Sequence, residues 1–450
     1  MTKDLTVGNP LRVIVNYMIP VFLGLLLQQA YNLVDTVVVG RFVGANALGG
    51  VGAASSLCLM VFGATMGLCS GFCIPIANAF GAKEDSRLRQ YLAHAIYLCG
   101  MNAGLVMFVF LTFCRPILTA MNTPVENFPF AYDYVHVYFL GIPFSVLYNL
   151  ASGVIRALGD SKTPLYFLIL SALTNIILDL VFVVGFGMGV AGVAIATMIA
   201  QALSCVCCHM YVGRKYEIFQ LTKETLVFDK DLLKGIIRYG VPSAIQQSVL
   251  SLNFMVVQRF VNFFGADMTA AFSVVNKIEN FVTMPQMNLA MALSMFAGQN
   301  IGAGEEKRAK QGVTDVLKMQ VAFWVVILFV LPMVASGLIR MFGMGDDANV
   351  MAIGVEAIKL CSKLYILFGF MQTFSNFLRG VGDAKYSMLT TICMILIRLP
   401  FTYVLVYMVQ YGEMSIWLGM GMGWLTVMTM NIVRYYKGGW RGKAFVQLKK

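Results

Sequence analysis

Charge and histidine are both scarce in this sequence. Only 12% of the 450 residues are Asp, Glu, Lys or Arg, and histidine occurs three times. By contrast, 59% of the residues are hydrophobic and the mean hydropathy is +0.75. A water-soluble protein of this length exposes far more charge, so the composition excludes a set of soluble domains and favours a chain that lies within lipid.

Metal and disulfide motifs are also missing. None of the ten cysteines has a metal-ligand spacing with the three histidines, and all ten fall in or at the ends of apolar segments. Cysteine in such places usually acts as a small buried hydrophobe. The sequence therefore predicts neither an extracellular disulfide framework nor a His and Cys metal centre, and no cofactor is expected. The opening stretch MTKDLTVGNPLRVIVNYMIP lacks a signal-peptide cleavage pattern, so we expect it to lead into a retained first span.

Long apolar runs are what the sequence does contain. They recur from end to end at about 20 residues each, the length of a helix that crosses a bilayer. About twelve spans are predicted, near 13–39, 48–79, 91–113, 131–156, 164–186, 190–212, 236–264, 270–300, 315–341, 352–378, 386–408 and 413–435. The predicted fold is an all-α polytopic membrane protein, which excludes a strand-built outer-membrane barrel.

Lys and Arg cluster in alternate connections between these spans. They precede the first span, follow the second, fourth, eighth and tenth, and fill the central loop and the tail. By the positive-inside rule, we expect both termini and the central loop in the cytoplasm. The net charge of +11 is then mostly a topology signal, and nucleic acid is not an expected partner.

The second half of the sequence repeats the first. Ile19-Pro20 matches Val241-Pro242, and FGAKEDSRLRQ (80–90) matches IGAGEEKRAKQ (301–311). GVIRALGDSKTP (153–164) matches NFLRGVGDAKYS (376–387), and all three pairs are offset by 221 to 223 residues. We interpret the shared R-x-x-G-D-x-K as a structural turn in which glycine allows a tight bend, rather than as a catalytic Asp and Lys.

The repeat predicts two six-helix lobes of the same orientation, related by a pseudo-two-fold axis along the membrane normal. We assign residues 1–213 to an N-terminal lobe and 236–435 to a C-terminal lobe. Residues 214–235 are expected to form a cytoplasmic linker, with a short amphipathic helix in DKDLLKGIIRYG (229–240) that leads into the seventh span. Residues 436–450 form a basic cytoplasmic tail.

Two aspartates lie at membrane depth in the first half alone. The repeat aligns Asp35 with about Val256, and Asp179 with about Thr402. An Asp at the centre of a bilayer costs roughly 2.5–3.5 kcal/mol, so such residues usually face an interior or a water-filled cavity. Gln28 and Asn32 share a helix face with Asp35, and Asn175 lies one turn from Asp179.

Other oxygen-bearing groups are expected near these acids. The glycine-rich hairpin GFGMGVAG (185–192) can bring Thr197 back alongside the fifth span. Carboxylate, amide and hydroxyl oxygens suit a proton or a small hard cation such as Na⁺. The alternative interpretation is that these groups only hydrogen-bond one helix to another, which is ordinary for threonine.

Three stretches resemble the multidrug and toxic compound extrusion (MATE) family: NLVDTVVVGRFVGANALGGVG (32–52), GVIRALGDSKTP (153–164) and NIILDLVFVVGFGMGVAGVAIATMIAQ (175–201). The resemblance covers most of the chain and implies two six-helix lobes that export organic cations or amphiphilic drugs in exchange for H⁺ or Na⁺. It places the coupling ion at Asp35, Asn175, Asp179 and Thr197, as in the prokaryotic branch with an aspartate in its first helix. Leu180 departs from the pattern, because many relatives have proline there.

Substrate recognition is assigned to further polar and methionine side chains. Methionine offers an adaptable, polarizable wall for varied ligands, although it is also common helix filler. The expected cavity residues are Gln28, Asn32, Gln246, Gln247, Glu279, Met284, Met287 and Asn288, with Lys277 as a potential ion-pair partner of Glu279. The lipid bilayer is the expected surrounding, and the protein is expected to work as a monomer.

Two other functions fit parts of the sequence. A flippase for a lipid-linked sugar would need several basic residues at mid-depth, and only Arg398 is a fair candidate. An intramembrane hydrolase could use two aspartates as a dyad. The repeat and the lack of a paired-aspartate protease motif argue against it, so no catalytic residue is predicted.

Overall fold

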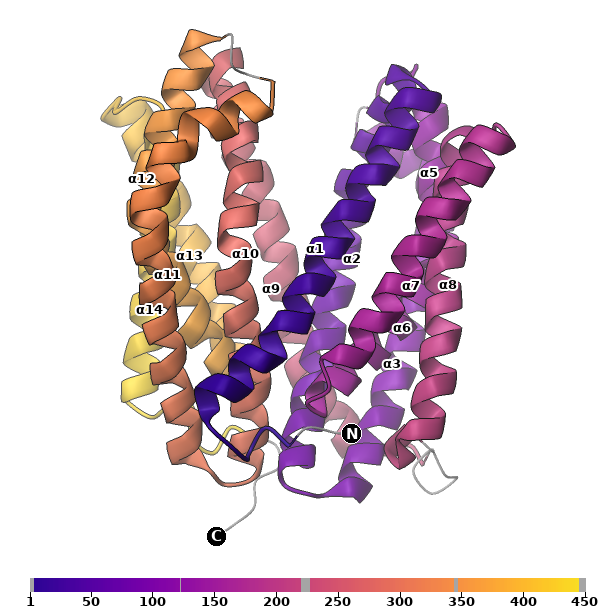
Figure 1. The fold of residues 1–450 in the computed structure, drawn as a ribbon, viewed down its shortest axis with the longest axis vertical. Coiled ribbons are helices and arrows are strands. Elements are labelled where there is room, and N and C mark those ends of the chain that lie inside the picture. Colours follow the sequence, from indigo (N-terminus) through magenta and orange to yellow (C-terminus); the bar gives the residue numbers. More distant parts are fainter. Residues whose placement is uncertain (1–3, 122, 220–226, 344–346, 445–450) are drawn as a thin grey trace. The chain divides into compact units, whose positions relative to one another are not determined.

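The computed structural model describes residues 4–121, 123–219, 227–343 and 347–444, and its regular elements there are all helical (Figure 1). The helices of the first half are α1 (Pro10–Phe42), α2 (Ala45–Gly81), α3 (Asp85–Thr112), α4 (Cys114–Ala120), α5 (Phe128–Leu140), α6 (Ile142–Ala157), α7 (Lys162–Asp179), the π-helical η1 (Leu180–Gly185), α8 (Gly189–Lys215) and the 3₁₀ turn η2 (Glu217–Phe219). Those of the second half are α9 (Lys230–Phe263), α10 (Ala266–Gly302), α11 (Glu306–Met341), α12 (Ala348–Gly380), α13 (Ala384–Tyr403), the π-helical η3 (Val404–Met408) and α14 (Ser415–Tyr436).

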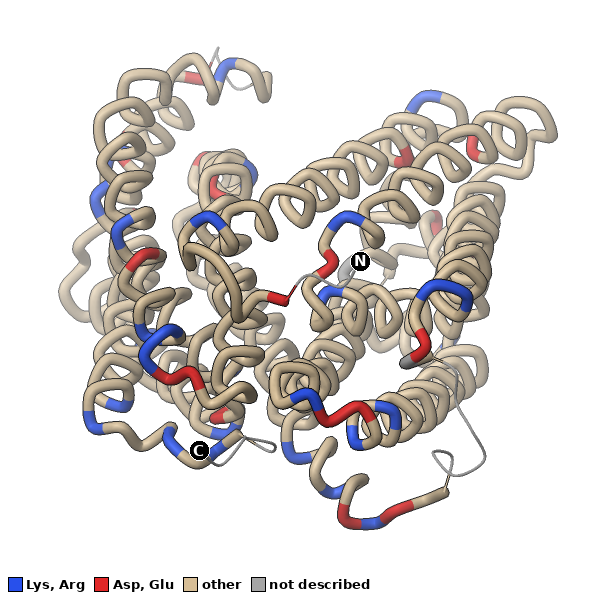
Figure 2. The backbone as a smooth tube through the Cα atoms, turned by 60° about the horizontal axis from the view of Figure 1, so that its bottom comes forward, with Lys and Arg blue, Asp and Glu red and all other residues tan. Residues whose placement is uncertain are grey.

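The predicted spans all fall on these helices. Eight helices in the described part are long and apolar enough to cross a membrane, and the pair α5 and α6, bent by 49°, makes a ninth. The remaining predicted spans correspond to α9, α10 and α12, which carry more polar residues. The all-helical, multi-pass fold is therefore confirmed. Figure 2 shows Lys and Arg mostly at turns and helix ends, as expected for helices whose middles lie in lipid.

The residues group into two compact units. The first unit is built around Ile19–Gln247, and the second combines Leu5–Met18 with Ser248–Lys450. The second unit therefore includes the beginning of α1, and the first unit includes the beginning of α9. Helices α1 and α9 are the elements that pass from one unit to the other.

Close backbone contacts hold the start of α9 in the first unit. A Cβ atom on Gly67 of α2 would lie 2.6 Å from the carbonyl oxygen of Ser243, and one on Gly71 would lie 2.6 Å from that of Tyr239. Only glycine permits this approach, as in other tightly crossing membrane helices. Just before α9, the backbone N–H of Asp229 donates to Nε2 of the buried His94 on α3, at 3.0 Å.

Buried amides hold the opening segment of the chain in the second unit. The Leu5 N–H donates to Oε1 of Gln299 at 3.0 Å, and its carbonyl oxygen accepts from Nδ2 of Asn300 at 3.3 Å. Arg308 on α11 donates to the carbonyl oxygens of Gly8 and Leu5, at 2.6 and 3.2 Å. Because these hydrogen bonds join the opening segment to α10 and α11, the segment belongs to the second unit.

One expectation for the linker is wrong. No separate amphipathic helix precedes the seventh span, because α9 runs from Lys230 through Gly240 and Pro242 to Phe263 without a break. Asp229 caps its start by accepting from the N–H groups of Asp231 and Leu232 at 2.8 and 3.2 Å. Part of the predicted linker, residues 220–226, and the last residues of the predicted tail, 445–450, lie outside the described residues.

The R-x-x-G-D-x-K loops are structural turns, as interpreted. Gly159 and Gly382 have φ angles of +83° and +94°, which favour glycine. Asp160 accepts hydrogen bonds from the N–H groups of Lys162 and Thr163 at 3.0 and 3.1 Å. Its other oxygen accepts from the hydroxyls of Thr163 and Tyr216, both at 2.7 Å, which ties the start of α7 to the end of α8.

These bonds set the charge of the loop. Burial alone would raise the pKa of Asp160, but the hydrogen bonds from Tyr216, Thr163 and the backbone outweigh it and hold that pKa below its ordinary value. Asp383, the counterpart of Asp160 in the second half, instead accepts from Nε of Arg434 on α14, at 2.9 Å. Both acids thus tie neighbouring helices together.

Candidate functional site

The two membrane aspartates of the first unit face one another. Asp35 comes from α1 and is half-buried, whereas Asp179 is the last residue of α7 and is fully buried. Their carboxyl groups lie within hydrogen-bonding reach of each other. Two ionised carboxylates at this separation repel strongly, so the pair needs a shared proton or an intervening cation.

Three of the four carboxylate oxygens of the pair lack a donor among the described residues. Both carboxylate oxygens of Asp179 and Oδ1 of Asp35 are buried and accept no hydrogen bond from a described residue. The side-chain oxygen of Asn175, one turn before Asp179, is likewise buried without a donor. Buried acceptors are normally satisfied, so four such oxygens in neighbouring positions indicate a site for a proton or a hard cation.

Asn175 is oriented by Thr197 across the hairpin. Nδ2 of Asn175 donates to Oγ1 of Thr197 at 3.2 Å, and Oγ1 donates onward to the carbonyl oxygen of Val193 at 3.1 Å. The amide nitrogen is used in this way, whereas the amide oxygen stays without a donor among the described residues. The structure therefore brings together the four residues that the sequence had grouped, from α1, α7 and α8.

Two tyrosines near the acids were missed by the sequence analysis. Tyr134 on α5 interacts electrostatically with both Asp35 and Asp179, and Tyr31 on α1 with Asp35. Tyr134 also packs against a cluster of valines from α1, η1 and α8 that includes Val38, Val183 and Val193. Helical spacing could have indicated Tyr31, which lies four residues before Asp35 on α1, whereas no residue pattern connects Tyr134 on α5 with the two acids.

The two halves share a backbone distortion but not the acids. A π-helical turn begins at Leu180, directly after Asp179, and another begins at Val404 in the second half. The α-helix is thus interrupted directly after Asp179 although Leu180, and not a proline, follows it. Thr402 stands at the position of Asp179 in the repeat and only donates to the carbonyl oxygen of Arg398, at 2.9 Å. The π turn therefore belongs to the repeated scaffold, and the carboxylate is the addition.

The predicted cavity residues differ widely in exposure. In the first unit Gln28, Gln246 and Gln247 are half-buried and Asn32 is exposed. In the second unit, the buried residues are Glu279 and Asn288, and the more accessible ones are Met284 and Met287. The expected pairing of Glu279 with Lys277 is wrong, because Lys277 is exposed and lies over the ring of Phe342, at 5.5 Å.

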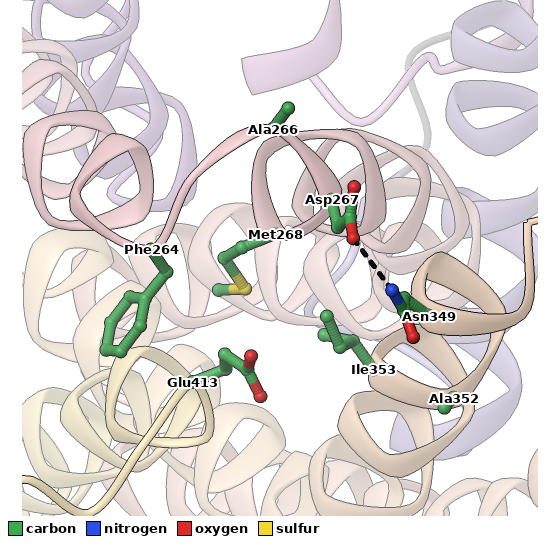
Figure 3. Close-up of a pocket in the computed structure, with 8 residues that line it drawn as sticks. All are labelled: Phe264, Ala266, Asp267, Met268, Asn349, Ala352, Ile353 and Glu413. Carbon is green, nitrogen blue, oxygen red and sulfur yellow. Dashed lines mark hydrogen bonds between the residues drawn. The ribbon is translucent and has the colours of Figure 1, made fainter.

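A separate pocket opens at one end of the second unit (Figure 3). It has a volume of about 480 Å³ and contains none of the predicted site residues. The residues lining it come from the turn after α9, the starts of α10 and α12 and the segment before α14. Asn349 donates to Asp267 there at 3.1 Å. In the described part of the chain, no group of three or more His, Cys, Asp and Glu side chains could hold a metal ion.

Comparison with known proteins identifies the family. The MatE family model matches residues 20–181 and 242–404, once in each half of the chain. The chain belongs to the MATE family. Its members are transporters and not enzymes, and the two matches fall on the same repeat that the sequence shows.

Curated relatives of this MATE protein span nearly its whole length. It is 30% identical to the probable multidrug resistance protein YoeA of Bacillus subtilis (strain 168), over 96% of this chain and 94% of YoeA. It is 22% identical to the multidrug export protein MepA of Staphylococcus aureus (strain MSSA476), with 88% and 87% covered. The FAD transporter of Shewanella oneidensis is also 22% identical, with 86% of each chain covered.

Solved structures confirm the fold of this MATE protein. A crystal structure of a MATE protein in its bent conformation superposes with a TM-score of 0.91 at 21% identity, covering 98% of both chains. An outward-facing multidrug resistance MATE transporter superposes with a TM-score of 0.88 at 22% identity, covering 97% of this chain and 98% of the other.

Proposed function

We propose that this protein is a secondary antiporter that exports organic cations or amphiphilic drugs in exchange for H⁺ or Na⁺. The coupling ion binds at Asp35 and Asp179, with Asn175 and Thr197 as neighbours. The facing carboxyl groups carry the proposal, because three of their four oxygens have no donor among the described residues and a dissociable ion would remove their repulsion. The multidrug names of relatives that match along nearly the whole chain support the export function.

Antiport requires that the ion and the drug favour different conformations of the protein. We propose that the site takes up its ion when it is open to the outside. Discharging the aspartate pair then changes the packing of α1 against α7 and weakens the hold on the drug. When the site opens inward, it releases the ion and the protein accepts a new drug molecule.

The helices that pass between the units have a feature suited to such a cycle. The division between units falls next to Pro20 in α1 and five residues after Pro242 in α9. A proline inside a helix removes one backbone hydrogen bond and permits bending. We propose that these prolines let α1 and α9 flex as the lobes rearrange. The same proposal includes cytoplasmic termini and a location in the inner membrane. It also includes membership of the branch of the family with an aspartate in its first helix.

Transport in proteoliposomes tests the coupling site. Wild-type protein should move a fluorescent organic cation under an imposed pH or sodium gradient, whereas Asp35→Asn and Asp179→Asn should lose gradient-driven transport. Asp133→Asn, which changes an exposed acid on α5, is the matched control and should behave as wild type. Equal transport by wild type and both site variants would refute the assignment, and movement of a lipid-linked sugar instead of any drug would favour a flippase.

The choice of ion has its own test. A proton needs only the two carboxyl groups, whereas Na⁺ also needs neutral oxygen ligands. Asn175→Ala should therefore reduce sodium-driven transport much more than pH-driven transport if Na⁺ is the coupling ion. A loss confined to pH-driven transport would contradict a role for the Asn175 oxygen as a sodium ligand.

A further inference from the structure

Two oppositely charged side chains lie deep inside the second unit. Glu279 on α10 is 8% exposed and Arg398 on α13 is 7% exposed. Glu279 lies about 20 Å along α10 from its start at Ala266, at 1.5 Å per residue, and Arg398 about 20 Å along α13 from Ala384. Both charges are therefore well within the membrane-spanning part of the unit, where an isolated charge is costly.

Glu279 and Arg398 attract each other, but each keeps one buried polar atom that lacks a hydrogen-bond partner in the described part of the chain. Each interacts electrostatically with the other. Nevertheless, Oε2 of Glu279 and Nε of Arg398 are buried and have no hydrogen-bond partner among the described residues. A buried ion pair that is broken or loosened leaves its charges uncompensated. This is strongly unfavourable unless another group binds to those charges. The pair thus retains one free acceptor and one free donor of opposite charge.

The arginine is held in place by the neighbouring helix. A Cβ atom on Gly423 of α14 would lie 3.3 Å from Cδ of Arg398 and 3.0 Å from Cγ of Met394. The stem of Arg398 therefore packs directly on the backbone of α14, where a Cβ at Gly423 would require Arg398 or Met394 to shift slightly. A guanidinium fixed in this way is pre-organised to bind a carboxylate with two parallel hydrogen bonds.

Aromatic side chains lie beside this pair. Tyr365 on α12 interacts electrostatically with Glu279, and its ring lies 6.1 Å from that of Trp424. The rings of Phe368 and Trp424 meet edge-to-face at 5.2 Å. These three residues belong to the same core cluster as Met394. Such rings offer flat apolar contact area to an aromatic ligand.

We propose that Glu279 and Arg398 form a recognition pair for substrates that carry both an ammonium and a carboxylate. The ammonium of such a zwitterion binds Glu279 and its carboxylate binds Arg398, so the complex stays neutral. A simple cation is repelled by Arg398 and a simple anion by Glu279, so each gains less from binding. This inference rests on the export function proposed above and narrows its substrate class.

The test uses three fluorescent compounds that share one aromatic ring system. One is an aromatic amino acid, the second is its methyl ester, which is only cationic, and the third is its N-acetyl derivative, which is only anionic. Binding to the purified full-length protein is followed by fluorescence anisotropy, and export is followed in proteoliposomes under a pH gradient. The ratio of affinities between compounds is the decisive readout, because it does not depend on the amount of active protein.

Wild type should bind the zwitterion at least about tenfold more tightly than the ester, since a charged hydrogen bond is gained. Arg398→Gln should abolish this preference, and Glu279→Gln should shift the preference towards the N-acetyl compound. Arg398→Lys should retain part of the preference. Glu356→Gln and Arg340→Gln, which change exposed charges of the same unit, serve as matched controls and should leave every ratio unchanged.

Unchanged ratios in both Glu279→Gln and Arg398→Gln would overturn the recognition pair, as would a wild type that binds all three compounds equally. These results differ from failure of the export proposal. If the zwitterion binds with the expected preference but no compound crosses the membrane under any gradient, the pair stands and the antiporter does not.

Discussion

The contact between α2 and α9 in the first unit allows a quantitative test. In Gly71→Ala, the new Cβ would lie 2.6 Å from the carbonyl oxygen of Tyr239 and 2.7 Å from Cα of Gly240. Ordinary contacts are 3.4–4 Å, so the two backbones must separate by roughly 0.8 Å. Because both sides are backbone, no side-chain rotation relieves the clash. Overpacking of this kind costs about 1–3 kcal/mol.

The same helix provides the control. A Cβ on Gly63 has no atom within 4 Å, so Gly63→Ala adds only the helix preference of alanine, worth about 0.5–1 kcal/mol. That preference is common to both variants and cancels between them. Gly71→Ala should therefore be about 1–3 kcal/mol less stable than Gly63→Ala in denaturant unfolding followed by far-UV circular dichroism in detergent. Equal stability of the two variants would refute the close crossing.

Two further changes probe individual hydrogen bonds. Tyr216→Phe removes the hydroxyl that donates to Asp160 and should cost about 1.5–3 kcal/mol of unfolding free energy near neutral pH, as expected for a bond to a charged group. The pKa of Asp160 is lower in the folded protein, so its contribution is complete above the ordinary pKa of about 3.9 and is lost as the pH falls through the folded value. Tyr216→Phe should weaken this acid dependence in a pH series of unfolding curves, and an unaltered acid limb would contradict it. Thr197→Val removes the hydroxyl that accepts from Asn175 and should impair gradient-driven transport, whereas Thr197→Ser keeps a hydroxyl and should retain transport. If Thr197→Val transports as well as Thr197→Ser, the hydrogen bond from Asn175 is not needed for coupling.

The sequence was enough to place the helices and to select the acids. Apolar runs between polar breaks predicted helices where the structure has them, and the repeat showed that Asp35 and Asp179 have no acidic counterparts in the second half. What it could not provide is the register between α1 and α7, which decides that the two carboxyl groups meet. That register depends on side-chain packing between helices far apart in the chain. The pattern thus selected the residues, and tertiary packing made them a pair.

The start of α9 shows the opposite case. The sequence predicted a short amphipathic helix over residues 229–240, and Gly240 and Pro242 at its end are residues that disfavour a helix interior. In the structure α9 continues through both, because the ring of Phe72 packs against Gly240 and the crossing with α2 supports the backbone there. Tertiary contacts outweigh the local preference of two residues.

The way Leu5 and Gly8 are bound has a consequence for biosynthesis. Their hydrogen-bond partners Gln299 and Arg308 lie 294 to 303 residues further along the chain. Leu5 and Gly8 are therefore translated long before these partners and can dock only after most of the chain that follows them has been made. Assembly cannot be completed in the order of translation, and the opening segment joins its binding place only after α10 and α11 have been inserted.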